Sequence, residues 1–170
     1  PGQWLFSENL GRRCLLVNDA DAAGVAELRY GAARGHDGLV IVTTLGTGIG
    51  IALLHKGVLI PNAELGHLSL DGHDAETRAA ASARDREGLS WAQWAARLQR
   101  YYSYLESLLW PDLFVVGGGV SRRSEKFLPL LSLRTPIVPA QRQNAAGLIG
   151  AAPLPAARRA RRANRVRRAT

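Results

Sequence analysis

The sequence contains one cysteine, Cys14, and no methionine in 170 residues. A lone thiol can form neither an internal disulfide nor a cysteine-rich zinc site. We therefore expect a protein of a reducing compartment, the cytoplasm. Because even the first position is not methionine, we also expect an internal or C-terminal piece of a longer chain.

Long apolar stretches are absent too. No run approaches the roughly 18–20 residues that a membrane-spanning helix needs. The first residues, PGQWLFSENLGRR, lack the basic and apolar regions of a signal peptide. We therefore expect no membrane partner. A hydrophobic content of 46% in 170 residues suits one globular domain with its own core.

Acidic residues are missing from the C-terminal end. The segment 155–170 holds seven arginines and no aspartate or glutamate, so removing it lowers the net charge from +8 to +1. The near-neutral remainder argues against nucleic acid as a partner. We interpret residues 153–170 as a disordered tail, because they offer little apolar surface to bury. Contact with a polyanion is the alternative.

The first predicted elements enclose two aspartates. An apolar run over 14–17 predicts a buried strand, and the alanine-rich stretch 20–33 predicts a helix that Gly35 closes. Asp19 and Asp21 lie where carboxylates favour a helix N-terminus. Two interpretations stay open: the pair serves only the helix start, or Asp19 is a catalytic base. The motifs that follow favour the second.

A glycine-containing turn at 45–48 joins two β-rich runs, 38–44 and 49–55, which predicts a hairpin, and 58–60 predicts a third short strand. Glycines let backbone N–H groups approach an anion closely, and threonine hydroxyls add donors. Turn formation without any ligand is the alternative. The candidate phosphate ligands are Thr43, Thr44, Gly46, Thr47, Gly48 and Gly50.

Acidic and histidine side chains gather after residue 61. Glu64 and His67 are three residues apart, and His73, Asp74 and Glu76 follow. Such groups can hold several hydroxyls in defined directions, which suits a sugar. A metal site is the weaker alternative, because the spacing differs from the His-x-x-x-His pattern of metalloproteases and thiolates are absent.

Two helices are predicted in the middle of the chain, over 75–86 and 91–109, with Gly88 between them and Ser90 as the N-cap of the second. The second has apolar residues at three- and four-residue spacing, which indicates a core face rather than a stacking platform. These residues are Trp94, Leu98, Tyr101, Leu105 and Leu108.

A strand predicted over 112–116 runs into three glycines, 117–119, and Ser121 opens another helix. Strand, glycines and helix form the layout that receives a phosphate at a helix N-terminus. The spacing is not that of the Gly-x-Gly-x-x-Gly fingerprint, so a dehydrogenase is not indicated. A last strand is expected over 135–138 and a small-residue helix over 144–152.

The motifs VNDADAAG, TTLGTGIG, ELGHL, DGHDAE and VVGGGVS occur in this order. As a series they resemble the C-terminal part of the ROK sugar kinases. Two longer stretches, GLSWAQWAARLQRYYSYLE and PDLFVVGGGVSRRSEKFLPLLSLRTPIVPA, resemble the polyphosphate glucokinases of actinobacterial type within that family. The resemblance covers about residues 12–152.

The resemblance implies an α/β, actin-like (ribonuclease-H-like) fold of two lobes, with residues 1–152 forming mainly the C-terminal lobe. It implies phosphoryl transfer from polyphosphate or ATP to the 6-hydroxyl of glucose, with Mg²⁺, in a homodimer. The family's N-terminal Asp-x-Gly-Gly-Thr motif is absent. We therefore expect the N-terminal lobe to be missing and the piece to be inactive alone.

The resemblance also implies residue roles. Asp19 is the implied catalytic base. The implied sugar ligands are Asn18, Glu64, His67 and Glu76. The implied phosphate loop contains Thr44, Gly46, Thr47, Gly48 and Gly50, and the implied nucleotide or polyphosphate side contains Gly117, Gly118 and Gly119.

The sequence departs from the family where many members carry a cysteine-rich zinc motif after Glu-x-Gly-His. Here GHDAETRAAA stands in that place, so we expect no metal ligands. Arg122, Arg123 and Lys126 either guide a polyanion or form a solvated helix face. The rival function is a sugar-binding transcriptional regulator of the same family, which would need a helix-turn-helix upstream.

Overall fold

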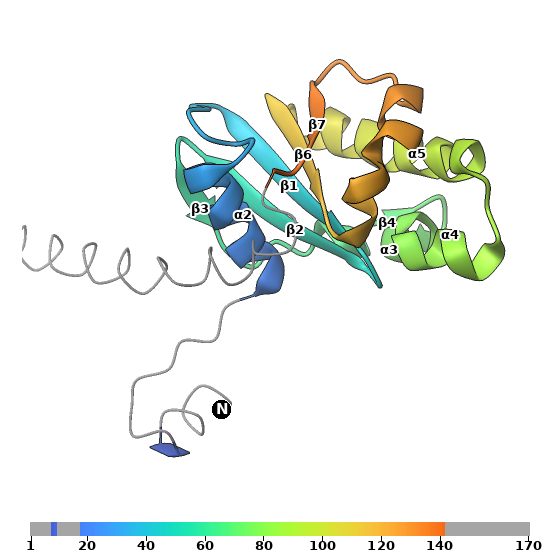
Figure 1. Ribbon diagram of the computed structural model, residues 1–170, viewed down its shortest axis with the longest axis horizontal. Helices are drawn as coiled ribbons and strands as arrows, with labels where there is room; N and C mark the ends of the chain where they lie inside the picture. The colour runs from blue at the N-terminus through green and yellow to red at the C-terminus, as the bar shows by residue number, and fades with distance from the viewer. Residues whose placement is uncertain (1–7, 10–17, 142–170) are drawn as a thin grey trace, which may run out of the picture.

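The computed structural model describes residues 8–9 and 18–141, drawn in colour in Figure 1. The strand predicted over 14–17, the helix predicted over 144–152 and the tail 153–170 lie outside the described residues. None of the described helices is long and apolar enough to cross a membrane.

A five-stranded mixed sheet with the order β3-β2-β1-β6-β7 forms the centre of the structure (Figure 1). β1, β2 and β3 pair antiparallel, whereas β6 lies parallel to β1 and β7 parallel to β6. The predicted hairpin and third strand are confirmed, and the later strands are shifted by one or two residues. The strands are β1 (Leu39–Leu45), β2 (Ile49–His55), β3 (Val58–Ile60), β6 (Leu113–Gly117) and β7 (Ile137–Pro139).

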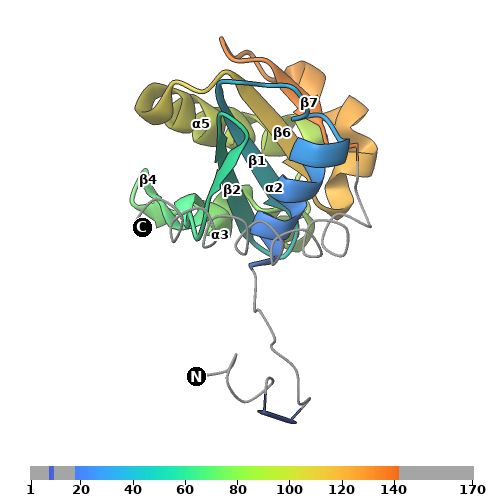
Figure 2. The same cartoon turned by 90° about the vertical axis from the view of Figure 1, so that its left-hand side faces the viewer.

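Different helices cover the two faces of this sheet. Side chains alternate between the faces along β1, so Ile41 packs in the apolar cluster of α5 (Trp91–Leu109), whereas Val40 packs in a second cluster. α2 (Asp19–Tyr30) lies over that second face, and Figure 2 shows the sheet between the two helices. Helices cover both faces of the sheet, and accordingly most side chains of β1 and β6 are apolar and buried.

Small residues bring α2 close to the sheet. A Cβ at Gly24 would collide with the Cβ of Ala52 on β2. The helix ends at Tyr30, sooner than predicted, because the Glu27 carboxylate accepts a hydrogen bond from the Ala32 amide at 2.7 Å and so replaces the next helical turn.

The long helix α5 has the predicted bounds. Ser90 caps it in a capping box with Gln93. The predicted core face is buried at Trp94, Leu98, Tyr101 and Leu105, but Leu108 is 54% exposed and the prediction was wrong there. In the last turn Leu109, four residues after Leu105, packs against the core instead.

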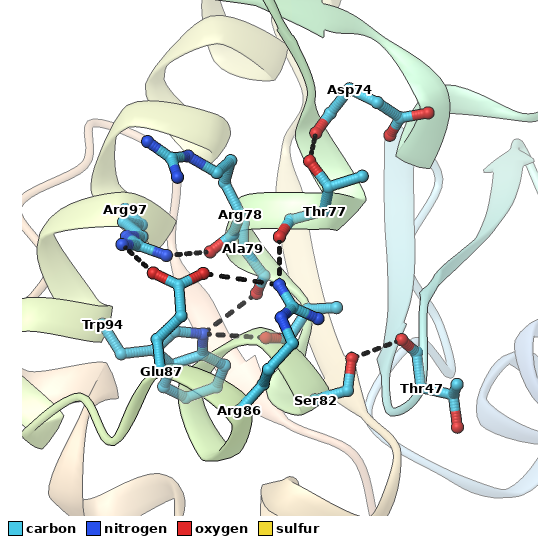
Figure 3. A network of polar contacts seen from close by, with 11 residues as sticks. Thr47, Asp74, Thr77, Arg78, Ala79, Ser82, Arg86, Glu87, Trp94 and Arg97 are labelled. Atoms are coloured by element: carbon cyan, nitrogen blue, oxygen red, sulfur yellow. Dashed lines mark hydrogen bonds and ion pairs between the residues drawn. The ribbon is translucent and has the colours of Figure 1, made fainter.

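The single helix predicted over 75–86 is two helices, α3 (Ala75–Ala79) and α4 (Ala81–Glu87), with Ala80 in an extended conformation between them. The cause lies on another helix. The Trp94 indole N–H donates to the carbonyl oxygens of Ala79 and Ala80 at 3.0 and 3.2 Å, so neither oxygen needs a helical partner (Figure 3).

The segment after the three glycines also differs from its prediction. It forms a 3₁₀ helix, η2 (Gly119–Lys126), rather than an α-helix opened by Ser121, and Arg123 interrupts it with non-helical backbone angles. A second 3₁₀ turn, η3 (Leu128–Leu130), follows. A regular helix N-terminus therefore does not face the end of β6.

Candidate active site

The N-terminus of α2 presents Asp19 without needing it as a cap. The Asn18 side-chain oxygen accepts hydrogen bonds from the amides of Ala20 and Asp21 at 2.8 and 3.4 Å and is the N-cap. Asp19 is exposed, and its Oδ1 accepts from the Ala20 amide at 2.8 Å. The capping task falls to Asn18, which leaves one Asp19 oxygen for another partner.

This helix start lies against the glycine-containing hairpin. A Cβ at Gly50 would collide with Oγ1 of Thr44 and would lie 2.9 Å from the Cβ of Ala20. Glycine is therefore required at position 50 by packing alone. The same contact places Asp19, one residue before Ala20, beside the predicted phosphate turn.

The turn at 45–48 is fixed from α4. The Ser82 amide donates to the Gly46 carbonyl at 3.0 Å. The Ser82 hydroxyl donates to the Thr47 carbonyl at 2.6 Å, as Figure 3 shows. The Gly46 amide donates to the Gly48 carbonyl at 3.0 Å. These bonds occupy the carbonyl oxygens and hold the loop in one conformation, which suits preorganised binding of an anion.

Glu76 reaches the same turn from α3. Its Oε2 accepts a hydrogen bond from the Ile49 amide at 2.9 Å, and the missing side chain of Gly48 makes room for that carboxylate. The structure thus places a predicted sugar ligand directly beside a predicted phosphate ligand.

Glu64 directly precedes a 3₁₀ turn, η1 (Leu65–His67), and His67 is its last residue; the turn packs on the start of β2. A Cβ at Gly66 would collide with the Ile49 carbonyl oxygen, so this close approach requires glycine. The turn therefore brings Glu64 and His67 to the strand end that Glu76 also contacts.

His67 is surrounded by carboxylates. Its Nδ1 lies 2.9 Å from Oδ2 of Asp74. This hydrogen bond, followed by the charges of Glu76, Asp74 and Glu64, raises the pKa of His67. The charges of two predicted ligands, Glu64 and Glu76, therefore act on the third, His67.

The glycines after β6 meet the glycine turn because β1 and β6 are parallel and end at the same edge. Gly118 has φ +85°, and a Cβ there would collide with the backbone of Leu45. Gly119 lines a cavity of about 540 Å³ together with Gly46 and Thr47. The predicted phosphate turn and the predicted nucleotide side thus share one cavity.

The wall of this cavity carries a net positive charge. Arg84, Arg122 and Arg123 line it together with Asp85, which is ion-paired with Arg84 at 2.8 Å. The Arg84 guanidinium lies 3.9 Å from the ring centre of Trp91, a cation–π contact that holds the cation at the cavity. A polyanionic ligand suits this lining.

Sequence reasoning missed the roles of Arg84 and Ser82, which it included only in a predicted helix. It grouped Asp74 with the candidate sugar-binding side chains and gave Asp21 no role beyond the helix start. The Asp21 side chain is 2% exposed, and its Oδ2 accepts from the Asn62 amide at 3.2 Å. A polar residue two positions after the exposed Asp19 lies on the other side of a helix, and that spacing was the available signal.

The described residues do not form a metal cage. In the part of the chain that the structure describes, no three His, Cys, Asp or Glu side chains are grouped to hold a metal ion. Mg²⁺ often binds through one or two carboxylates, waters and the phosphates of a substrate. Asp19, beside the turn, fits only such a partial role.

Comparison with known proteins identifies the class. Residues 3–85 match the model of the ROK family, so the chain carries a ROK family domain. It superposes with a TM-score of 0.75 on a ROK family glucokinase from Streptomyces griseus in complex with glucose and AMPPNP, at 25% identity over 89% of this chain and 71% of that one. The expected α/β, actin-like ROK sugar kinase fold is thereby confirmed.

Two relatives are more similar. The polyphosphate glucokinase of Mycobacterium tuberculosis (strain H37Rv) is 51% identical over 142 residues, which cover 84% of this chain and 54% of that protein. The crystal structure of inorganic polyphosphate/ATP-glucomannokinase from Arthrobacter sp. strain KM has a TM-score of 0.85 and 59% identity, over 88% of this chain and 59% of that one. The chain thus spans about half the length of these relatives.

Proposed function

We propose that the protein to which this chain belongs transfers the terminal phosphoryl group of polyphosphate or ATP to the 6-hydroxyl of glucose. The observation that carries the proposal is the meeting of two sets of groups at one end of the sheet. Glu76, a candidate sugar ligand, accepts a hydrogen bond from the Ile49 amide just after the turn at 45–48, and Gly46 and Thr47 of the turn line the cavity with the three arginines. The names of the relatives support the same activity.

The part of the site formed by Glu64, His67 and Glu76, here called the acceptor side, would hold the sugar. Glu64, His67 and Glu76 lie together at the start of β2, and their oxygens and ring nitrogen can accept or donate hydrogen bonds to several hydroxyls. Asn18 uses its side-chain oxygen as a cap, so its amide group is the part left to contact a sugar.

The donor side would hold the phosphates. In the proposal, backbone groups of the loop 44–50 contact the transferred phosphoryl group. Gly117 to Gly119 lie behind it, and the cavity with Arg84, Arg122 and Arg123 receives the rest of the donor. This arrangement favours the polyanion-guiding interpretation of Arg122 and Arg123 over that of a merely solvated face.

Asp19 would act as the general base. Phosphoryl transfer has a loose transition state whose charge is spread over the equatorial oxygens, so positioning and electrostatic stabilisation contribute most. The proton of the attacking hydroxyl then moves late, so a carboxylate within reach of that hydroxyl can accept it. Bound Mg²⁺ would neutralise charge on the donor phosphates.

Several further properties belong to this proposal. We propose a cytoplasmic homodimer without nucleic-acid partners, a catalytic region over residues 1–152 and an unstructured tail over 153–170. A sugar-binding regulator is not favoured, because the relatives with 51% and 59% identity are named as kinases.

The test is glucose 6-phosphate formation with Mg²⁺, with polyphosphate and ATP as separate donors. It would be run on the 170-residue chain and on the chain preceded by the upstream region of the M. tuberculosis relative. We expect activity only in the extended form, and Asp19→Asn should lower its turnover by about 10²-fold or more. A loss below about threefold would remove Asp19 from the base role.

Failure of the extended form to make product with either donor, while its fold is intact, would overturn the kinase proposal. Retained glucose binding in that case would support the regulator.

A further inference from the structure

Asp74 joins β5 (His73–Asp74) to α3, and its two carboxylate oxygens have different partners. Oδ1 accepts a hydrogen bond from the Glu76 amide at 3.0 Å, which caps α3. Oδ2 lies 2.9 Å from Nδ1 of His67. One carboxylate therefore contacts two residues of the acceptor side that come from different elements.

We propose that Asp74 is a positioning residue of the acceptor site, which fixes the His67 ring so that its Nε2 contacts a sugar hydroxyl and, when the ring is neutral, accepts a hydrogen bond from it. This inference rests on the proposed function. When Nδ1 carries the hydrogen that it donates to Asp74, Nε2 of the neutral ring is left as an acceptor. Asp74 thus selects both the orientation and the tautomer of His67.

A purely structural role does not account for both contacts. Capping α3 requires only one oxygen, and Oδ1 supplies it. The His67–Asp74 pair is partly exposed, with side-chain exposures of 54% and 38%, and exposed pairs contribute little to folding stability. The second contact is therefore best explained by what it does to the ring.

Electrostatics support the same pairing. The hydrogen bond to Asp74 is the main cause that raises the pKa of His67, and the hydrogen bond to His67 is the main cause that lowers the pKa of Asp74. The other charged groups that act on His67 are Glu76 and Glu64. Because these two stay in place when Asp74 is changed, the effect of Asp74 can be measured separately.

Two substitutions separate capping from positioning. Asp74→Ser keeps an oxygen for the Glu76 amide but removes the partner of Nδ1. Asp74→Asn is an excellent cap through its oxygen, and its NH₂ group then faces His67 and imposes the opposite tautomer. Ser90→Ala, which removes the cap of α5 far from the sugar ligands, is the matched control.

The measurements are the His67 titration by NMR on this chain and the glucose dissociation constant of the extended form. In both Asp74 variants we expect the His67 pKa to fall toward its ordinary value and glucose binding to weaken at least fivefold. Ser90→Ala should change neither quantity. In a His67→Ala background, Asp74→Ser should weaken binding less than twofold further, because Asp74 acts through His67.

Three outcomes would overturn the inference. An unchanged His67 titration would show that the pair does not exist in solution. A shifted titration with unchanged glucose affinity would show that the pair does not position a sugar ligand. Full glucose affinity in Asp74→Asn would reduce Asp74 to a cap. Loss of glucose binding by the unsubstituted extended form would instead contradict the proposed function itself, and the titration would still decide whether the pair forms.

Discussion

At the scale of single residues, the first turn of α2 gives three neighbouring polar side chains three tasks. Asn18 caps the helix, Asp19 is exposed beside the turn, and Asp21 is buried, where it accepts the Asn62 amide. Asn62 begins the loop that carries Glu64, and its φ is +59°. Asp21 therefore ties the loop that carries Glu64 to the helix that bears the proposed base.

Burial of Asp21 also lowers the stability of the folded state. Its Oδ1 is buried without a hydrogen-bond partner among the described residues. Burial, assisted by the Glu64 carboxylate, raises the pKa of Asp21 despite the hydrogen bond from Asn62. The folded state thus holds the proton more tightly than the unfolded state, and the ionised side chain destabilises the fold.

We predict that Asp21→Asn increases the free energy of unfolding at pH 7 by about 1 kcal/mol, or about 2–4 °C in Tm, because a neutral amide keeps the Asn62 bond without a buried charge. The gain should be largest above the raised pKa. It should shrink as pH falls toward 3.8, where the wild-type carboxyl becomes protonated. Urea unfolding between pH 4 and 8 measures this.

The exposed Asp37→Asn is the control and should show no comparable gain. A pH-independent difference between Asp21→Asn and wild type would contradict the assignment.

At the scale of elements, the break between α3 and α4 organises the turn. Glu76 lies before the break and bonds to the Ile49 amide, whereas Ser82 lies after it and bonds to Gly46 and Thr47. In a single straight helix over 75–86, all side chains would project from one common axis, so the helix could approach the turn from one side only. The break lets two short helices hold the hairpin turn from two sides.

Trp94 is the side chain that stabilises this break. We predict that Trp94→Phe lowers the free energy of unfolding by about 2–4 kcal/mol, because it leaves the carbonyls of Ala79 and Ala80 without their donor and opens a small cavity. Denaturant unfolding checks the magnitude. Trp110→Phe, at a site 69% exposed, should cost less than about 1 kcal/mol. Equal losses in the two variants would remove the special role of Trp94.

At the scale of the whole molecule, the parallel pairing of β1 and β6 decides where chemistry is possible. Thr44 pairs with Gly117, so the turn at 45–48 and the three glycines extend from the same sheet edge. The proposed acceptor residues His67 and Glu76 lie on η1 and α3, and the cationic residues of the cavity lie on α4 and η2. Four segments far apart in sequence thus surround one turn.

The charge distribution is also a property of the whole molecule. We predict that ending the chain after Leu154 leaves the Tm within about 1 °C, because the removed residues are mostly arginine and alanine. The net charge falls from +8 to +1, so retention on a polyphosphate resin should decrease. Differential scanning calorimetry and salt elution measure the two effects.

A 170-residue variant with the seven arginines changed to glutamine is the matched control, and it should elute with the truncated chain. A drop in Tm of several degrees after truncation would show instead that the tail packs on the body.

The sequence by itself determined the parts that depend on local patterns. Alternating and apolar runs with glycine between them predicted the β1–β2 hairpin, and Ser90 with periodic apolar residues predicted α5. The order of the motifs predicted the ROK fold. The resemblance carried by these motifs also implied roles for Asp19, Glu64, His67 and Glu76, and these roles stay predictions.

Only the tertiary structure decided the rest. The break at Ala80 depends on an indole from another helix, and the partners of Asp74 and Asp21 come from loops brought near by the sheet. The cavity with Arg84 needs α4 and η2 to meet across the turn. These features arise from contacts between distant segments, whose spacing is set by strand register and close packing at glycines, and no local pattern encodes them.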